Sequence, residues 1–161
     1  MDEKRFLVLK TDVEVQLAVI DEVCAKIEDR ARGFKTDDAR PIQVESVAYQ
    51  IHNSYSAIKA LLRVLAAHFE YQISDAIHWK SALLLRMIQP IPGVRPAPLT
   101  KETFVLLDAL RGFHYFFRHA YATTIDPVLL ESNLQLSRQA HSLLHRDITE
   151  FLDQLDPSEA S

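Results

Sequence analysis

The 161-residue chain has few of the residues that interrupt helices or cross-link the backbone. It contains three glycines, and four of its seven prolines fall within residues 90–98. Because glycine and proline most often end regular segments, their scarcity elsewhere predicts long uninterrupted helices. The single cysteine, Cys24, cannot form an internal disulfide, and no cluster of cysteine and histidine has the spacing of zinc ligands. We therefore expect a reducing environment and a cytoplasmic protein.

The sequence also lacks an excess of basic charge and any apolar run of membrane-spanning length. Its 18 lysines and arginines are outnumbered by 22 acidic residues, which gives a formal net charge of -4. This balance argues against a surface that coats nucleic acid without specificity, because such a surface needs surplus Lys and Arg. Residues 1–12 mix acids and bases around a short apolar stretch, unlike a signal peptide. We expect no secretion and no membrane span, and any polyanion must be bound locally.

The apolar residues that are present recur at steps of three and four, which places them along one face of a helix. No alternating pattern typical of strands, no internal repeat and no low-complexity segment competes with this rhythm. The sequence therefore predicts an all-α protein, an antiparallel helical bundle of about five helices. Residues 1–155 are expected to form a single domain, and residues 156–161 a frayed tail. The expected helices begin near Phe6, Pro41, Trp79, Thr100 and Asp126.

One short stretch, RGFHYFFRHAY at residues 111–121, gathers basic and aromatic side chains and holds no acid. Residues at positions i, i+3, i+4 and i+7 share one face of a helix and are expected to face the core. They are Phe113, Phe116, Phe117 and Ala120. The polar side chains fall on the opposite arc, where solvent, a partner chain or a ligand must take them up. These are Arg111, His114, Tyr115, Arg118, His119 and Tyr121.

Arginine and histidine together permit a limited chemistry. Arginine binds phosphate through a charged fork, and histidine gives or takes a proton near neutral pH. This combination suits RNA cleavage without a metal, since magnesium would require carboxylates. On one straight helix, His114 and His119 lie about 140 degrees apart, so only a groove between two copies could aim both at one atom. The alternative is a solvated helix face with a few aromatic contacts, and spacing alone leaves both open.

Four segments carry a resemblance to a known family: HNSYSAIKALL, WKSALLLRM, PIPGVRPAPLTKET and LLDALRGFHYFFRHAY. Over about residues 45–130 the sequence resembles the HepT-like branch of the HEPN superfamily. The resemblance implies a homodimeric helical toxin whose arginine and histidine line the dimer cleft and cleave RNA without a metal or other cofactor. It also implies a nucleotidyltransferase antitoxin of the MNT type, which can add AMP to a tyrosine two residues past the histidine. Here these residues would be Tyr121 and His119.

The sequence departs from the family motif on the fourth expected helix. That motif resembles Phe-Arg-His-x-x-Arg-His-x-Tyr, and Arg118, His119 and Tyr121 match it. His114 stands where the motif has its catalytic arginine, and Tyr115 stands where it has histidine. A His114 cation at mildly acid pH, or Arg111 one turn earlier, could substitute for the missing arginine.

A second departure lies on the second expected helix. The family pattern resembles His-Asp-x-Tyr-Ser-x-Ile-Glu, whereas this chain has Asn53 in place of the aspartate and Lys59 in place of the glutamate. Loss of an acid here and of a base at His114 could reflect an ion pair removed as a unit, because one buried charge left alone is costly. His52, Asn53 and Tyr55, together with Tyr115, are candidates to line the cleft, although core packing explains His52 and Tyr55 equally well.

Two classes of function therefore stay open. The first is a metal-independent endoribonuclease toxin, with His119 as acid or base and Arg118 holding the phosphate with Arg111 or His114. The second is a catalytically degenerate HEPN dimer that pairs with a nucleotidyltransferase or binds nucleotide or RNA without cutting it.

Other candidate sites are weaker. His141 and His145 are four residues apart and could share a metal, but no third ligand is apparent, so we interpret them as surface histidines. Trp79 could stack on a base or belong to the core. Arg95 in the proline-rich loop could reach a partner, or the prolines could merely prevent fraying between the helices. We expect no metal site and no cofactor.

Overall fold

The computed structural model describes residues 1–69, 79–120 and 123–158. Over these residues the protein is all-α, with five helices and no strand, apart from one isolated bridge between Ile91 and Arg95. The predicted bundle of about five helices is confirmed. The helices are α1 (Glu3–Arg30), α2 (Pro41–Phe69), α3 (Trp79–Met87), α4 (Lys101–His119) and α5 (Pro127–Leu155).

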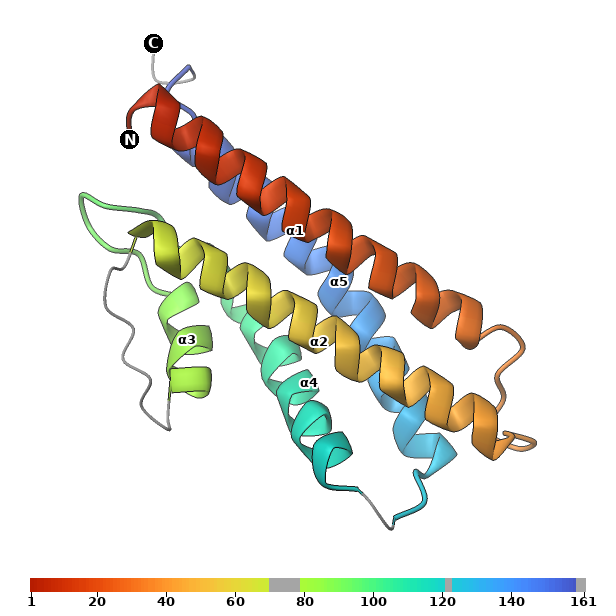
Figure 1. Ribbon diagram of the computed structural model, residues 1–161. Coiled ribbons are helices and arrows are strands. Elements are labelled where there is room, and N and C mark those ends of the chain that lie inside the picture. The colour runs from red at the N-terminus through yellow and green to blue at the C-terminus, as the bar shows by residue number, and fades with distance from the viewer. Residues whose placement is uncertain (70–78, 121–122, 159–161) are drawn as a thin grey trace.

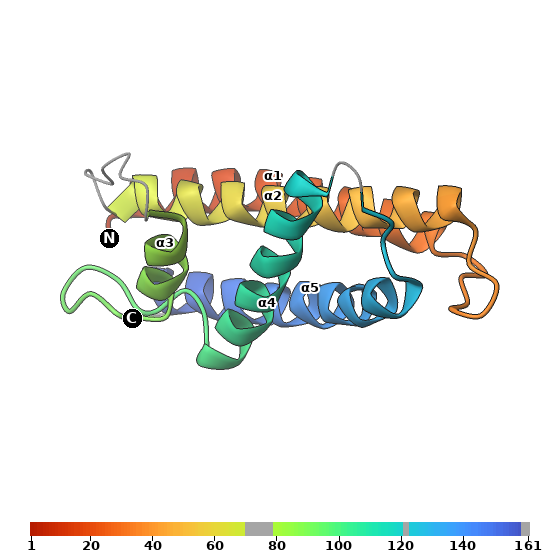
Figure 2. The same cartoon turned by 90° about the horizontal axis from the view of Figure 1, so that it is seen from below.

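The three longest helices form the frame of the molecule. In Figure 1, α1, α2 and α5 lie along one another, and both α2 and α5 run opposite to α1, so the two chain termini meet at one end. Figure 2 shows α1 and α2 on one side and α5 on the other, with α4 steeply inclined between α2 and α5. None of the helices in the described residues is long and apolar enough to cross a membrane.

Local sequence signals determine where the helices begin. The hydroxyl of Thr100 accepts a hydrogen bond from the backbone N–H of Thr103, and the carboxylate of Asp126 accepts one from Val128. Pro127 occupies the first turn of α5, where its missing N–H costs no hydrogen bond. The predicted starts at Thr100 and Asp126 are therefore confirmed.

The apolar stripes predicted from the sequence form one core. Burial of this surface is the main force that holds the helices together, at about 25 cal/mol per Å² of apolar area. The most enclosed members of this core include Leu9, Val13, Ile51, Ile58, Leu144 and Ile148.

A buried carboxylate ties the start of α4 to α5. Asp147 accepts hydrogen bonds from the backbone N–H of Thr100 at 2.8 Å and from the hydroxyl of Thr103 at 2.6 Å. Arg146 donates to its other oxygen at 2.9 Å. Burial tends to raise the pKa of Asp147, but these hydrogen bonds outweigh it and hold the pKa below its usual value. This anchor fixes the first turn of α4, which carries the candidate site at its other end.

The proline-rich loop folds inward at Arg95. This side chain is buried and donates hydrogen bonds to the backbone carbonyls of Arg86, Gln89 and Pro96. Gly93 has a φ of 74°, which an L side chain rarely adopts, and it allows the tight turn between Ile91 and Arg95. Of the two possibilities left open for this loop, contact of Arg95 with a partner is not favoured, because its buried guanidinium holds the loop together.

Candidate functional site

The buried face of α4 differs from the predicted one at a single important position. Phe113 is buried and Phe116 and Phe117 pack partly against the core, as predicted. His114, expected on the exposed arc, is only 7% exposed, so that expectation is wrong. Leu107 and Leu110 start a stripe with alternating steps of three and four, and His114 is its next member. This side chain therefore faces α2 instead of solvent.

His114 belongs to an aromatic cluster between α4 and α2. Its ring stacks on the ring of His52, with centroids 4.1 Å apart and planes 6° from parallel. His114 Nδ1 donates a hydrogen bond of 3.4 Å to the backbone carbonyl of His52. The ring of Tyr55 lies 4.9 Å from His114, and the ring of Phe117 lies 4.9 Å from His52. We call these four residues the aromatic cluster.

Both histidines of the aromatic cluster are held in the neutral form at neutral pH. Burial lowers the pKa of His114 to about 4, and the positive charges of Lys59 and Arg118, together with that of His52 when its ring is protonated, add to the effect. Burial likewise lowers the pKa of His52. This contradicts the expectation of a His114 cation at mildly acid pH, because His114 stays neutral there and offers no charge to phosphate.

The last turn of α4 carries the exposed polar residues. Arg118 and His119 are both exposed, and Arg118 forms no ion pair with any other residue that the structure describes. Tyr115 is 66% exposed and its ring lies 4.5 Å from that of His119. Both basic residues also suit a helix C-terminus, where the helix dipole favours cations. We refer to Tyr115, Arg118 and His119 as the α4 ridge.

Arg111 lies at the edge of this region, one turn before Tyr115. Its guanidinium donates two hydrogen bonds, of 3.0 and 2.8 Å, to one oxygen of Asp108. The two side chains are 39% and 45% exposed, and surface pairs of this kind contribute about 0–1 kcal/mol. Arg111 could therefore leave Asp108 at little cost, so the second substitute for the missing arginine stays open.

The other candidate site residues differ in how far they are buried. Tyr55 is buried and burial raises its pKa to about 12, which favours packing over cleft lining. His52 and Asn53 are half-buried, and His52 Nδ1 is a buried atom without a hydrogen-bond partner among the described residues. Tyr121 and the side chain of Trp79 lie outside the described part, so those two predictions are untested.

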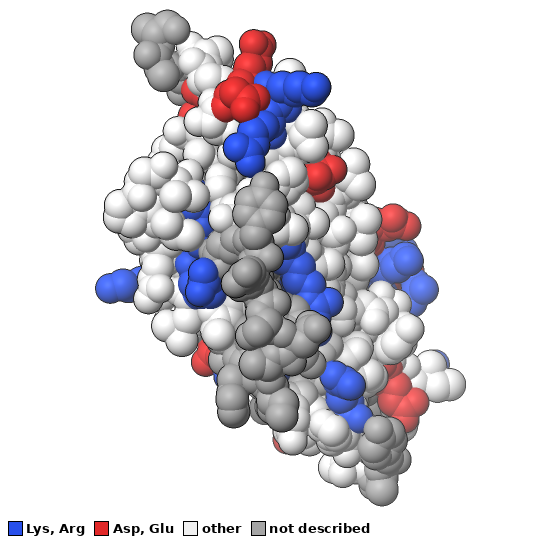
Figure 3. Space-filling view, turned by 60° about the vertical axis from the view of Figure 1, so that its left-hand side comes forward, with Lys and Arg blue, Asp and Glu red and all other residues white. Residues whose placement is uncertain are grey.

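Basic side chains are present locally despite the net negative charge of the chain. On the face shown in Figure 3, Lys and Arg lie across the middle, and Asp and Glu lie mostly toward the margins. The positive charges of Lys59 and Arg118 both lower the pKa of His52 and of His114, so these two cations lie near the aromatic cluster. A phosphate group could be bound near Lys59 and Arg118 even though the protein as a whole is not basic.

The architecture is that of a HEPN-type helical bundle with a basic, imidazole-bearing ridge at the end of α4. The sequence model of the HepT-like protein family matches residues 46–155, which run from α2 to the end of α5. The chain therefore belongs to the HepT-like family of the HEPN superfamily, and α1 lies outside the matched span. No curated protein and no solved structure shows a significant match.

Proposed function

We propose that this protein is a metal-independent endoribonuclease toxin that acts as a homodimer and is neutralised by a nucleotidyltransferase antitoxin. Membership in the HepT-like family supports a ribonuclease-like toxin function in general terms. The observation that carries the finer proposal is the α4 ridge, where Arg118 and His119 are consecutive in the sequence and both exposed. An exposed imidazole beside a guanidinium is the minimum needed for proton transfer next to a bound phosphate.

In the proposed reaction the ribose 2′-oxygen attacks the adjacent phosphorus. His119 takes the proton of the 2′-hydroxyl, and Arg118 binds the non-bridging oxygens, whose negative charge grows in the transition state. A second group protonates the departing 5′-oxygen, which leaves a 2′,3′-cyclic phosphate and a free 5′-hydroxyl. His114 is buried and neutral, so we assign this second transfer to His119 of a second copy. HEPN domains commonly dimerise, which makes such a pairing available.

The aromatic cluster has a positioning role in this proposal. It packs the last two turns of α4 against α2 through His52, His114 and Phe117. Its rings are neutral, so no unpaired charge is buried where the family motif has an arginine. This supports the hypothesis that an ion pair was removed as a unit, with Lys59 now in place of the acid.

The test is RNA cleavage by the purified protein in the presence of EDTA. We expect wild type to cut single-stranded RNA and His119→Ala to lose activity by about 100-fold or more, since a general acid or base contributes about that factor. A matched control is His68→Ala, which removes a histidine that bonds Asp12 at the α1–α2 contact. If wild type and His119→Ala are equally inactive, and expression of either leaves growth unaffected, the protein is not a ribonuclease toxin.

A second candidate function is a dimeric module that binds RNA or nucleotide, or a nucleotidyltransferase, without cutting. The observation that favours it is the neutral His114 at the position of the catalytic arginine. A protein of this kind would bind single-stranded RNA with an affinity that falls with salt, and it would leave the RNA intact. Binding without cleavage in the same experiment separates it from the enzyme.

The proposed antitoxin would act at Tyr121, by adding AMP to its hydroxyl. Mass spectrometry of the toxin after co-expression with its nucleotidyltransferase partner should show one added AMP, which Tyr121→Phe should lack. Neutralised toxin with an unmodified Tyr121 would refute this mode of control and leave the ribonuclease proposal intact.

A further inference from the structure

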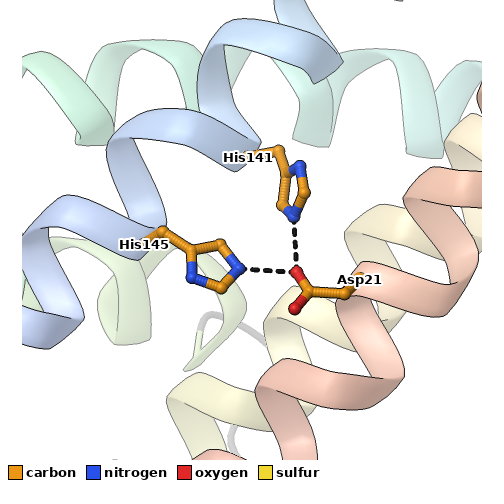
Figure 4. Close-up of side chains that lie close together, drawn as sticks. All are labelled: Asp21, His141 and His145. Carbon is orange, nitrogen blue, oxygen red and sulfur yellow. Dashed lines mark hydrogen bonds and ion pairs between the residues drawn. The ribbon is translucent and has the colours of Figure 1, made fainter.

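Three potential metal ligands converge between α1 and α5. His141 and His145 are four residues apart on α5, so their side chains lie on the same face. Figure 4 shows both imidazoles directed at the carboxylate of Asp21 on α1. The Nε2 atoms of His141 and His145 lie 2.6 and 2.5 Å from the same oxygen, Asp21 Oδ1. The expectation that the two histidines have no third ligand is wrong, because the third comes from a helix 120 positions earlier in the chain.

A neighbouring contact shows how this cluster differs from an ordinary ion pair. Glu28 lies seven residues after Asp21 on α1, and Arg138 lies seven residues before His145 on α5. Glu28 accepts two hydrogen bonds from Arg138, of 2.7 and 2.9 Å, one on each oxygen. In that pair one guanidinium binds both oxygens of one carboxylate, so neither carboxylate oxygen lacks a hydrogen bond. At Asp21, two imidazole nitrogens instead converge on a single oxygen, and the three ligand atoms lie within 4.8 Å of one another. Three potential ligand atoms this close together could bind one metal ion.

We propose that Asp21, His141 and His145 form a binding site for a divalent transition metal ion, with zinc as the best fit. Two imidazole nitrogens and one carboxylate oxygen are a ligand set that zinc prefers, whereas magnesium and calcium prefer oxygen ligands alone. In a tetrahedral site with zinc bonds of about 2.0–2.1 Å, ligand atoms are about 3.3 Å apart. The two short contacts would open by less than 1 Å, which is within reach of side chains that are 31–47% exposed.

The site leaves room for further ligands. It borders a surface pocket of about 270 Å³ whose lining includes Asp21, His141 and Cys24. With three protein ligands, a tetrahedral ion would keep a fourth position for water or a small anion.

The consequence for the protein would be a bond between α1 and the rest of the bundle. Asp21 lies on α1, outside the residues that match the HepT-like family, whereas His141 and His145 lie on α5, within them. An ion that binds only the folded arrangement stabilises it. The site shares no residue with the α4 ridge, so the proposal is independent of metal-free RNA cleavage.

The direct test is titration of zinc chloride into chelator-treated, full-length protein by isothermal titration calorimetry. We expect one zinc ion per chain in wild type, and a dissociation constant weakened by at least about 100-fold in His145→Ala and in Asp21→Asn. His68→Ala is the control, because His68 also bonds an aspartate of α1, Asp12, but with one imidazole only. It should bind zinc as wild type does.

Thermal unfolding gives a second readout that also shows whether the variants fold. Zinc should raise the melting temperature of wild type and of His68→Ala, and leave His145→Ala and Asp21→Asn unchanged although both unfold cooperatively. The proposal is overturned if wild type takes up no stoichiometric zinc. It is also overturned if His145→Ala and Asp21→Asn bind zinc as tightly as the wild type does.

Discussion

The His52–His114 pair and the His141–His145 pair consist of the same side chains in opposite environments. The first pair is stacked between α2 and α4, with His114 almost fully buried and aromatic rings on its flanks. The second pair is edge to face on the surface of α5, with its centroids 5.0 Å apart and both rings bonded to Asp21. Burial makes the first pair a neutral packing element. Exposure and a carboxylate make the second pair a place where a cation can bind.

Of the two histidines of α4, only His119 is placed to exchange protons with a substrate. A histidine that exchanges protons with RNA needs exposure and a pKa near neutrality, and burial deprives His114 of both. His119, five residues later on the same helix, is exposed beside Arg118. In the proposed reaction, the α4 ridge therefore depends on the His52–His114 pair for its position and on His119 for proton transfer.

The largest expected effect comes from putting an arginine back at the buried pair. His114→Arg should destabilise the protein by about 3–5 kcal/mol, because it buries a cation beside Lys59 without a partner. The double variant His114→Arg with Lys59→Glu should recover a large part of this loss, because the acid restores a partner. Denaturant unfolding of the two single variants and the double variant measures the coupling. Additive effects would mean that the two departures from the family motif arose independently.

Lowering the pH should reduce the free energy of unfolding by an intermediate amount. A histidine titrates near pH 6.5 in an unfolded chain, whereas the pKa of His114 is about 4 in the folded protein. Between these values the unfolded state binds more protons than the folded state. The contribution of neutral His114 to the free energy of unfolding is therefore fully present above about pH 6.5 and is lost as the pH falls toward 4. The loss at pH 4 is about 2–3 kcal/mol.

The matched variant for this pH test is His114→Phe, which keeps a ring of similar size and cannot be protonated. Its free energy of unfolding should fall less than that of wild type between pH 7 and pH 4.5, when both are measured by urea denaturation. Parallel curves would show that His114 titrates normally and that it is not buried as described.

The smallest expected effect is at the exposed pair in the absence of metal. His145→Ala in EDTA should change the free energy of unfolding by less than about 1 kcal/mol, because exposed ion pairs contribute little. Chemical denaturation beside wild type measures the difference. A loss as large as that expected for a buried side chain would remove the contrast between the two pairs.

The sequence predicted those parts of the fold that depend on local signals. The helices follow from apolar periodicity, and the starts of α4 and α5 follow from Thr100 and from Asp126 with Pro127. The exposure of Arg118 and His119 also follows from their positions on the helical wheel. These features need only the chain itself, since a helix fixes the direction of each side chain relative to its neighbours.

The parts that were missed depend on contacts between distant segments. The role of Asp147 requires the start of α4 to meet α5, and the role of Asp21 requires α1 to meet α5. His114 is a partial exception, because extending the stripe from Leu107 and Leu110 would have placed it in the core. The composition of the segment drew attention to its charge instead, and a buried polar residue was read as an exposed one.

Two copies of the α4 ridge share one reaction site in the proposed mechanism. This arrangement is tested most directly by RNA cleavage in EDTA by a heterodimer of wild type and His119→Ala, isolated through a different tag on each chain. Because both imidazoles take part in one reaction, we predict an activity at least about tenfold below that of the wild-type dimer. Half of the wild-type activity, or a protein that cuts RNA as a monomer, would contradict the account.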